Sequence, residues 1–559
     1  MRFAAATLVL FTALTAVMTY PQVLHLTDTV HDDGDPLLNA WALAWVAHQL
    51  PRAPAHLFDA NIFYPERRTL AFSETLIVPA AIVAPLHWIG VGPLLVYNLV
   101  FLSGFIVSGV GVALLVRSLT GSGAAGIIGG IVFAFLPFRI DHYPHLQLQQ
   151  TQCLPFAFWA FHRLLQTGRL RDGVLFGAFT AGQVLSCMYY GLFLVPYMAV
   201  VCGVMLVALR SMSKERLTAL VAAGAIALVA VIPVGRAYLG ARQVVGERGA
   251  EEVADRGATW ENYLGPPEAN AVYGSIFKHF AASERRLFPG FVAVALAAAA
   301  FLPRRRADGS AVHLPNYQLT DPPTTAAYLV GLVIAFDMSL GFNGLTYGVL
   351  YRYVLPFRSL RIPARMGIMV GFSLAVLAGF GAHRLATAIQ SPSRRRAFIV
   401  VVAALMLVEY ASKPLDLRQI PTSPPESYAD IVRDRGDSPT AAIFEFPASP
   451  FDDPTYMYYS TFHWQHLVNG YSGFFPPSYQ RVLHAMSEFP DEAAFDAIRS
   501  HGARYLVVRG ERLFGARYEE LIPELDRRRD LTLVSRRPAS GGGERQEISV
   551  YRLSYASVR

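Results

Sequence analysis

The sequence predicts an α-helical polytopic membrane protein followed by a C-terminal α/β domain. Three features indicate this fold. Hydrophobic residues make up 53% of the 559 residues and charged residues only 16%, a balance far from that of soluble domains. About eleven apolar segments are long enough to cross a hydrocarbon core of roughly 30 Å as helices. After residue 413 the composition changes, and short β-rich runs alternate with helical stretches and many charged residues.

Each apolar segment is predicted to form one membrane-spanning helix of about twenty residues. The first could instead belong to a signal peptide, but it has a single basic residue, Arg2, and no A-x-A cleavage site before Pro21. An uncleaved helix is therefore expected. The predicted spans are residues 3–20, 93–116, 122–138, 150–167, 171–189, 191–209, 216–236, 288–303, 324–341, 366–387 and 397–413.

Clusters of Lys and Arg give the predicted orientation, because cytoplasmic loops carry an excess of both residues. Counting the apolar segment 75–92 as a further crossing would move all but the first cluster to the outer side. It is therefore predicted as a helix on the outer face. The N-terminus is then cytoplasmic and the C-terminal domain extracytoplasmic. The clusters are Arg2, Arg117, Arg163/Arg169/Arg171, Arg210/Lys214/Arg216, Arg304–Arg306 and Arg394–Arg396.

The predicted domains are a transmembrane domain, residues 1–413, and an outer α/β domain, residues 414–559. The second contains β-rich runs at 441–444 and 505–508 among helical stretches, and residues 540–544 are predicted to form a loop tip. The net charge of +7 lies largely in the short cytoplasmic loops, so no nucleic-acid partner is expected. The three cysteines show no metal-binding or disulfide spacing.

The first outer loop carries the strongest functional signal, an acidic run at residues 31–36. Asp35 is expected to be the N-cap of a surface helix whose first residue is Pro36. The run holds two further aspartates, Asp32 and Asp33, which is more than one helix cap needs. Asp33 and Asp35 could also hold a divalent cation, Mg²⁺ or Mn²⁺, between their carboxylates, although an isolated D-x-D is a weak signal.

The second outer loop, residues 139–149, contains Asp141, His142 and His145. These three side chains could contribute to the same cation site. The histidines could instead be hydrogen-bonding groups at the membrane surface. Tyr189 and Tyr190, at the outer end of a predicted span, could line the same cavity or belong to the aromatic belt of the membrane interface.

The outer region 342–365 breaks the charge rule, because it places four arginines beside a membrane helix. Guanidinium groups bind phosphate oxygens in two-point contacts and stay charged at every working pH. A lipid-linked phosphate is one expected partner, and lipid headgroups in general are the other. The candidate phosphate ligands are Arg361 and Arg365, followed by Arg358.

Two further segments could contact a substrate. The outer loop at 237–287 is long enough to close over a bound molecule and exclude water. The run 463–477 in the C-terminal domain is rich in aromatic residues, glycine and amides. It could stack against a sugar acceptor, or it could be a turn-rich packing motif against the membrane domain.

An aspartate at the start of a juxtamembrane helix after the first span, a second juxtamembrane helix at 75–92 and an acidic second outer loop together resemble the type C glycosyltransferases (GT-C). This superfamily includes the protein O-mannosyltransferases and the lipid A aminoarabinose transferases. The resemblance covers the architecture of residues 1–240, and motifs match only sparsely.

The resemblance implies an inverting glycosyltransferase that takes a sugar from a polyprenyl-phosphate donor. The acceptor would be a lipid, glycan or protein of the cell envelope, at the outer face of a bacterial-type cytoplasmic membrane. The resemblance places the general base or acceptor-orienting group on Asp35, with Asp33 second, and a further acidic group on Asp141. Membrane lipids are the other expected partners.

Two other functions fit the same composition. A lipid or polysaccharide transporter, or flippase, would also combine many membrane helices with basic outer loops. Ionisable residues near the middle of the bilayer would favour it, but Asp337 and Glu409 are expected near outer ends of their spans. A non-catalytic partner in envelope assembly would tolerate changes at the aspartates.

Overall fold

The computed structural model describes residues 2–209, 211–302, 322–437, 440–513, 516–539 and 547–555. The basic cluster Arg304–Arg306, Arg210 and the loop tip predicted at 540–544 lie outside these residues. The chain forms two compact units. Unit 1 comprises Met1–His25, Leu99–Pro233 and Glu247–Asp416, and unit 2 comprises Leu26–Asn98, Val234–Gly246 and Leu417–Arg559.

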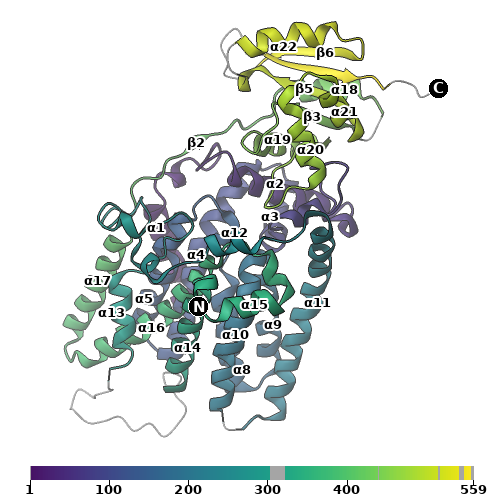
Figure 1. Cartoon of the computed structure of the whole chain (residues 1–559). Helices are drawn as coiled ribbons and strands as arrows, with labels where there is room; N and C mark the ends of the chain where they lie inside the picture. Colours follow the sequence, from purple (N-terminus) through teal and green to yellow (C-terminus); the bar gives the residue numbers. More distant parts are fainter. Residues whose placement is uncertain are drawn as a thin grey trace. The chain divides into compact units, whose positions relative to one another are not determined.

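Every apolar segment that was predicted to cross the membrane contains a helix (Figure 1). By length and composition, five helical stretches of the described chain could span a bilayer, namely Pro93–Thr120, Gly123–Asp141, Met188–Ala208, Lys214–Val245 and Pro363–Ala388. The larger count of about eleven spans stays a prediction. The helices are α1 (Arg2–Met18), α4 (Pro93–Thr120), α5 (Gly123–Ala134), α8 (Cys153–Thr167), α9 (Leu170–Ser186), α10 (Met188–Ala208), α11 (Lys214–Val245), α13 (Phe291–Ala299), α14 (Pro322–Ser339), α16 (Gly367–Ala388) and α17 (Pro392–Glu409).

Helix α16 is the centre of unit 1. It packs against α5, α13 and α14, and nearly all of its residues are buried. Elsewhere in the unit, α8 packs along α9 and α10 along α14. Gly173 and Gly177 face α11 so closely that a Cβ atom at either position would overlap its backbone. Small residues spaced in this way allow helices to approach closely inside a membrane.

Two acidic residues at the ends of unit 1 helices act as helix caps. Glu409 accepts hydrogen bonds from the backbone N–H groups of Phe291 and Val292 at the start of α13, at 2.7 and 3.1 Å. Asp337 accepts two at the start of α15 (Thr346–Tyr353), both at 2.8 Å. Negative charge at a helix N-terminus is stabilised by the unpaired N–H groups there. These contacts give both acids a structural role.

Unit 2 contains a five-stranded mixed sheet in the order β4-β3-β5-β7-β6. Strand β3 pairs in parallel with β4 and β5, and β7 is antiparallel to β5 and β6. The β-rich runs predicted at 441–444 and 505–508 fall on β3 and β5. The strands are β3 (Ala442–Phe446), β4 (His466–Leu467), β5 (Ala503–Arg509), β6 (Leu531–Pro538) and β7 (Glu547–Leu553).

Helices α18 and α22 contact β6, and α21 contacts β5. A short ladder pairs β1 (Thr29–Val30) with β2 (Arg418–Gln419). The helices of the C-terminal part of unit 2 are α18 (Ser427–Asp434), α19 (Asp453–Ser460), α20 (Pro477–Ala485), α21 (Glu492–Ser500) and α22 (Ala516–Arg527).

Two helices of the first predicted outer loop, α2 (Asp35–Gln49) and α3 (Ile77–Trp88), pack against each other in unit 2. The indole N–H of Trp88 donates to the Ala47 carbonyl at 2.9 Å and ties the end of α3 to α2. Helix α2 also packs against α19. The loop that carries the acidic run is therefore built into the same compact unit as the C-terminal sheet.

The prediction that Asp35 is the N-cap of its helix was wrong by one residue. Gly34 occupies the N-cap position, so Asp35 is the first helical residue and Pro36 the second. The reason is the side chain of Asp32, whose Oδ1 accepts the Gly34 N–H at 2.8 Å. This turn, closed by an aspartate side chain, starts the helix one residue early.

Candidate functional site

The acidic run of unit 2 presents its three carboxylates in different surroundings. Asp32 is half-buried in its turn, and burial raises the pKa of its carboxyl. The negative charges of Asp35 and Asp33 raise this pKa further, whereas the hydrogen bond from the Gly34 N–H lowers it. Asp33 is paired with Arg418 at 3.1 Å and is 39% exposed. Asp35 accepts a hydrogen bond at Oδ1 from the hydroxyl of Tyr471, at 2.8 Å.

Tyr471 belongs to the aromatic run 463–477, which packs against the first-loop part of unit 2. The ring of Trp464 stacks on His48 with centroids 4.0 Å apart. The Phe63 N–H donates to the Asn469 carbonyl at 3.1 Å, and Gly470 lies so close to the Phe63 ring that a Cβ atom would overlap it. The run is thus a packing motif, and at Tyr471 it also reaches the candidate catalytic carboxylate.

In unit 1, the carboxylate of Glu284 brings three of the candidate residues together. Arg365 donates to it through Nε and Nη2, at 3.2 and 2.9 Å. The Nε2 atom of His142 lies 3.0 Å from Glu284 Oε2, and that of His145 lies 3.7 Å from Oε1. The second predicted outer loop, the loop before α13 and the turn Pro363–Met366 just before α16 therefore meet at one side chain.

The carboxylate of Glu284 is held in its charged form. Burial opposes ionisation, but the Arg365 guanidinium and the hydrogen bond with His142 outweigh it and keep the pKa of Glu284 well below its usual range. The backbone of Glu284 has φ +64°, a left-handed conformation that is strained for any residue with a Cβ atom. Strained residues of this kind persist where the surrounding contacts impose them, and they cluster at functional sites.

This carboxylate predicts a pH dependence of stability. A carboxyl whose pKa is lowered by folding stabilises the folded state above its unfolded pKa of about 4.3, and the stabilisation is lost as the pH falls toward the folded pKa. Glu284→Gln is therefore expected to lower the melting temperature in detergent at pH 7, with a difference that shrinks below about pH 4. If the difference in melting temperature between the wild type and Glu284→Gln stays constant from pH 7 to 3.5, Glu284 is not a charged, stabilising carboxylate.

Asp141 lies beside this cluster and is paired with a different arginine. Arg286 donates to Asp141 at 2.9 Å and to Glu268 at 2.6 Å. The Nδ1 atom of His142 lies 3.8 Å from the Asp141 carboxylate. The structure therefore brings Asp141, His142, His145 and Arg365 into one network of charged side chains within unit 1.

The other candidate arginines find carboxylate partners elsewhere in unit 1. Arg361 lies 2.9 Å from Glu252, and Arg358 lies 3.9 Å from Glu247. Arg358 also donates to the Tyr351 and Arg352 carbonyls, at 3.2 and 2.9 Å. Both guanidinium groups remain more than a third exposed, whereas Arg365 is 9% exposed. The long loop at 237–287 thus supplies the counter-charges for the basic region 342–365.

Tyr189 is part of the surroundings of Arg365. Its ring lies 5.1 Å from the Arg365 guanidinium, a distance at which the aromatic face attracts a cation. Its hydroxyl accepts a hydrogen bond from the Ile362 N–H. Tyr189 therefore covers one face of the guanidinium and leaves the edge that carries the N–H groups to Glu284.

The residues that the structure describes contain no group of three or more His, Cys, Asp and Glu side chains arranged to hold a metal ion. Asp33 and Asp35 belong to unit 2, and Asp141, His142 and His145 to unit 1. Binding of Mg²⁺ or Mn²⁺ by these residues stays a prediction from the sequence.

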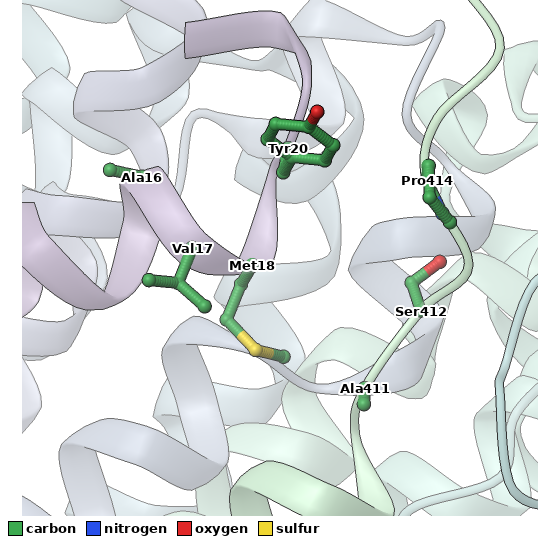
Figure 2. Close-up of a pocket in the computed structure, with 7 residues that line it drawn as sticks. All are labelled: Ala16, Val17, Met18, Tyr20, Ala411, Ser412 and Pro414. Atoms are coloured by element: carbon green, nitrogen blue, oxygen red, sulfur yellow. The ribbon is translucent and has the colours of Figure 1, made fainter.

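An open pocket of unit 1 lies between the end of α1 and the segment after α17 (Figure 2). None of its lining residues carries a charge at neutral pH, and most are apolar. It offers neither a base nor a phosphate ligand. The lining residues are Ala16, Val17, Met18, Tyr20, Ala411, Ser412 and Pro414.

Two contacts were missed by the sequence analysis. Glu284 had no assigned role, although it connects Arg365 with both histidines, and Tyr471 was named only as part of a run. Glu284 stands next to the basic pair Arg285-Arg286 inside the loop at 237–287. An acidic residue in that setting was the one available signal, and it is weak.

The fold of the whole chain is similar to that of a solved glycosyltransferase structure. No family model and no curated protein matches the sequence. Among solved structures, the arabinofuranosyltransferase AftD from Mycobacteria aligns over 99% of this chain with a TM-score of 0.65 and 14% identity. The resemblance to the type C glycosyltransferases is confirmed for the fold. This chain spans 40% of the length of AftD.

Two further solved structures align less well. The oligosaccharyltransferase AglB from Archaeoglobus fulgidus matches 100% of this chain and 75% of its own, with a TM-score of 0.45 and 13% identity. ArnT from Cupriavidus metallidurans matches 98% of both chains, with a TM-score of 0.39 and 13% identity. Similarity at these scores does not by itself establish a common fold.

Proposed function

We propose that this protein is a membrane glycosyltransferase that moves a sugar from a polyprenyl-phosphate donor to an acceptor of the cell envelope. The observation that supports this most is the fold shared with an arabinofuranosyltransferase over 99% of the chain. The carboxylate of Asp35 in the first turn of α2, bonded to Tyr471, adds a candidate base. Incubation of the purified protein with a panel of polyprenyl-phosphate sugars, with release of polyprenyl phosphate as the readout, tests the proposal.

The proposed reaction is an inverting displacement at the anomeric carbon. An acceptor hydroxyl attacks that carbon while Asp35 takes up its proton or aligns it. The bond to the donor oxygen breaks, and its electron pair leaves with the polyprenyl phosphate. Arginine side chains would stabilise the negative charge that develops on this leaving group. Asp33 is the second candidate for the base.

The proposed setting is the outer face of a bacterial-type cytoplasmic membrane. The distribution of basic residues in the sequence supports a cytoplasmic N-terminus and an extracytoplasmic domain at 414–559. About eleven crossings belong to the same proposal. A transporter or flippase is the less favoured function, because Asp337 and Glu409 are engaged as helix caps instead of lining an ion path.

Tyr471 is expected to support the reaction through its hydrogen bond to Asp35. Hydrogen bonds to charged groups contribute about 1.5–3 kcal/mol to stability, so Tyr471→Phe should lower the melting temperature. It should also lower kcat by roughly 10- to 100-fold, because Asp35 loses a group that orients it.

Tyr555→Phe is the matched control for this variant. It removes a tyrosine hydroxyl of the same unit that donates to the Ala503 carbonyl, at 2.7 Å, and not to Asp35. An unchanged kcat in Tyr471→Phe would mean that the hydrogen bond to Asp35 serves packing alone.

A further inference from the structure

We infer that Arg365, His142 and His145 form a phosphate-binding site that the Glu284 carboxylate fills in this structure. The identity of the phosphate as that of a sugar donor rests on the proposed function. The site itself does not, because it is argued from the contacts of unit 1 alone. Glu284 would then act as an internal competitor of the bound phosphate.

The geometry around Glu284 is that of an anion site. A guanidinium contacts its two oxygens through two nitrogens, at 2.9 and 3.2 Å. Two imidazole nitrogens approach the same oxygens, at 3.0 Å from His142 and 3.7 Å from His145. Arginine makes the same two-point contact with phosphate as with carboxylate. The donors come from two segments of the chain that are distant from Glu284 in sequence, the second predicted outer loop and the turn Pro363–Met366 before α16.

Because the donor side chains are buried, they need an anion beside them, either Glu284 or one that replaces it. Arg365 is 9% and His142 1% exposed, and the Tyr189 ring covers part of the guanidinium. A buried guanidinium without a counter-charge is strongly unfavourable. When Glu284 leaves, another anion is therefore required, and a phosphate can contact several donors at once through its oxygens.

The position of Glu284 in the chain makes it the replaceable part of the site. It lies outside the helices and strands, in the loop before α13, and its φ of +64° is unfavourable for a residue other than glycine. Its neighbours hold the loop by other contacts, since Arg285 donates to the Gly257 carbonyl and Arg286 to Asp141. Withdrawal of Glu284 relieves local strain, whereas Arg365 and His142 lie in well-buried segments.

The test measures phosphate binding by the full-length protein in a phosphate-free maltoside detergent. The probes are inorganic phosphate, a short-chain prenyl phosphate and phosphatidic acid, each followed by calorimetry and by the shift in melting temperature. Glu284→Gly removes the internal carboxylate and suits the backbone conformation. It is expected to bind at least one of these phosphates about ten-fold more tightly than the wild type, by analogy with the loss of a competing ligand.

The source of the phosphate follows from which probe gains. A gain for the prenyl phosphate alone identifies a lipid-linked donor, a gain for phosphatidic acid alone identifies membrane headgroups, and equal gains show recognition of phosphate itself. All three support the site. Adding Arg365→Gln to Glu284→Gly must remove the gain, and Glu268→Gln, which removes an exposed carboxylate bonded to Arg286, should bind like the wild type.

The inference is overturned if Glu284→Gly gains affinity for none of the probes, or if the gain survives the loss of Arg365. Should Glu284→Gly fold poorly, its yield in phosphate is compared with its yield in chloride at equal ionic strength. Rescue by phosphate supports the site and equal yields overturn it. Sugar transfer is not part of the readout, so a failure here leaves the proposed function standing, and a failure of transfer leaves this site standing.

Discussion

Asp35→Asn is expected to abolish sugar transfer while the protein stays folded. The amide keeps the size of the side chain and can still accept the hydrogen bond from Tyr471, but it cannot take up a proton. General-base catalysis contributes about 10²- to 10⁴-fold to a rate, so kcat should fall by roughly that factor. The melting temperature and the detergent elution profile should match those of the wild type.

The matched control is Asp28→Asn, in the same loop. The Asp28 carboxylate accepts an exposed, 3.4 Å hydrogen bond from the Gln419 side chain, and loss of its charge should leave kcat unchanged. Asp33→Asn compares the two candidate bases, because Asp33 is paired with Arg418 and partly exposed. If Asp35→Asn keeps full activity with its true donor and Asp33→Asn does not, the base is Asp33. If both keep full activity, the proposed chemistry at this run is wrong.

Arg365→Gln is expected to cause the largest loss of stability among the candidate site residues. It leaves the Glu284 carboxylate without its two-point partner in a site where both groups are largely buried. Removing one member of a buried ion pair typically costs about 3–5 kcal/mol. Thermal unfolding of the detergent-solubilised protein should therefore shift to clearly lower temperature.

The control for this prediction is Arg361→Gln, since Arg361 is 43% exposed and paired with Glu252. Exposed ion pairs contribute roughly 0–1 kcal/mol, so its melting temperature should stay near that of the wild type. The double variant Arg365→Gln/Glu284→Gln should regain part of the stability that Arg365→Gln loses, because no unpaired charge remains. Equal melting temperatures for both single arginine variants would contradict the buried pair.

The helices of the membrane part could be predicted from the sequence because apolar length alone identifies them. Each predicted span has a helix, and the segment 75–92, predicted to lie on the outer face, contains α3 (Ile77–Trp88). The first residue of a helix was harder to predict where two nearby side chains could each start the helix. At the acidic run, the turn closed by Asp32 decided the first residue of α2, and the Asp35-Pro36 pair alone gave no sign of it.

The candidate site could be predicted only in part, because its contacts join distant positions. Arg365 and His142 were both proposed, but Glu284, which joins them, lies 142 positions from His142. Tyr471 lies 436 positions from Asp35. Charge and aromatic content mark such residues as candidates, whereas pairing depends on how helices and loops pack in three dimensions. Candidate site residues can therefore be predicted from the sequence more readily than the residues that they contact.

The most direct test of the proposed function uses the purified protein reconstituted in liposomes with radiolabelled polyprenyl-phosphate sugars and envelope acceptors. We expect one donor to yield free polyprenyl phosphate and a labelled acceptor, with the product absent for Asp35→Asn. Movement of intact donor across the bilayer without cleavage of its sugar bond would contradict the proposal and identify a transporter. Absence of both reactions, with no stabilisation by any lipid-linked donor, would contradict it in favour of a non-catalytic partner.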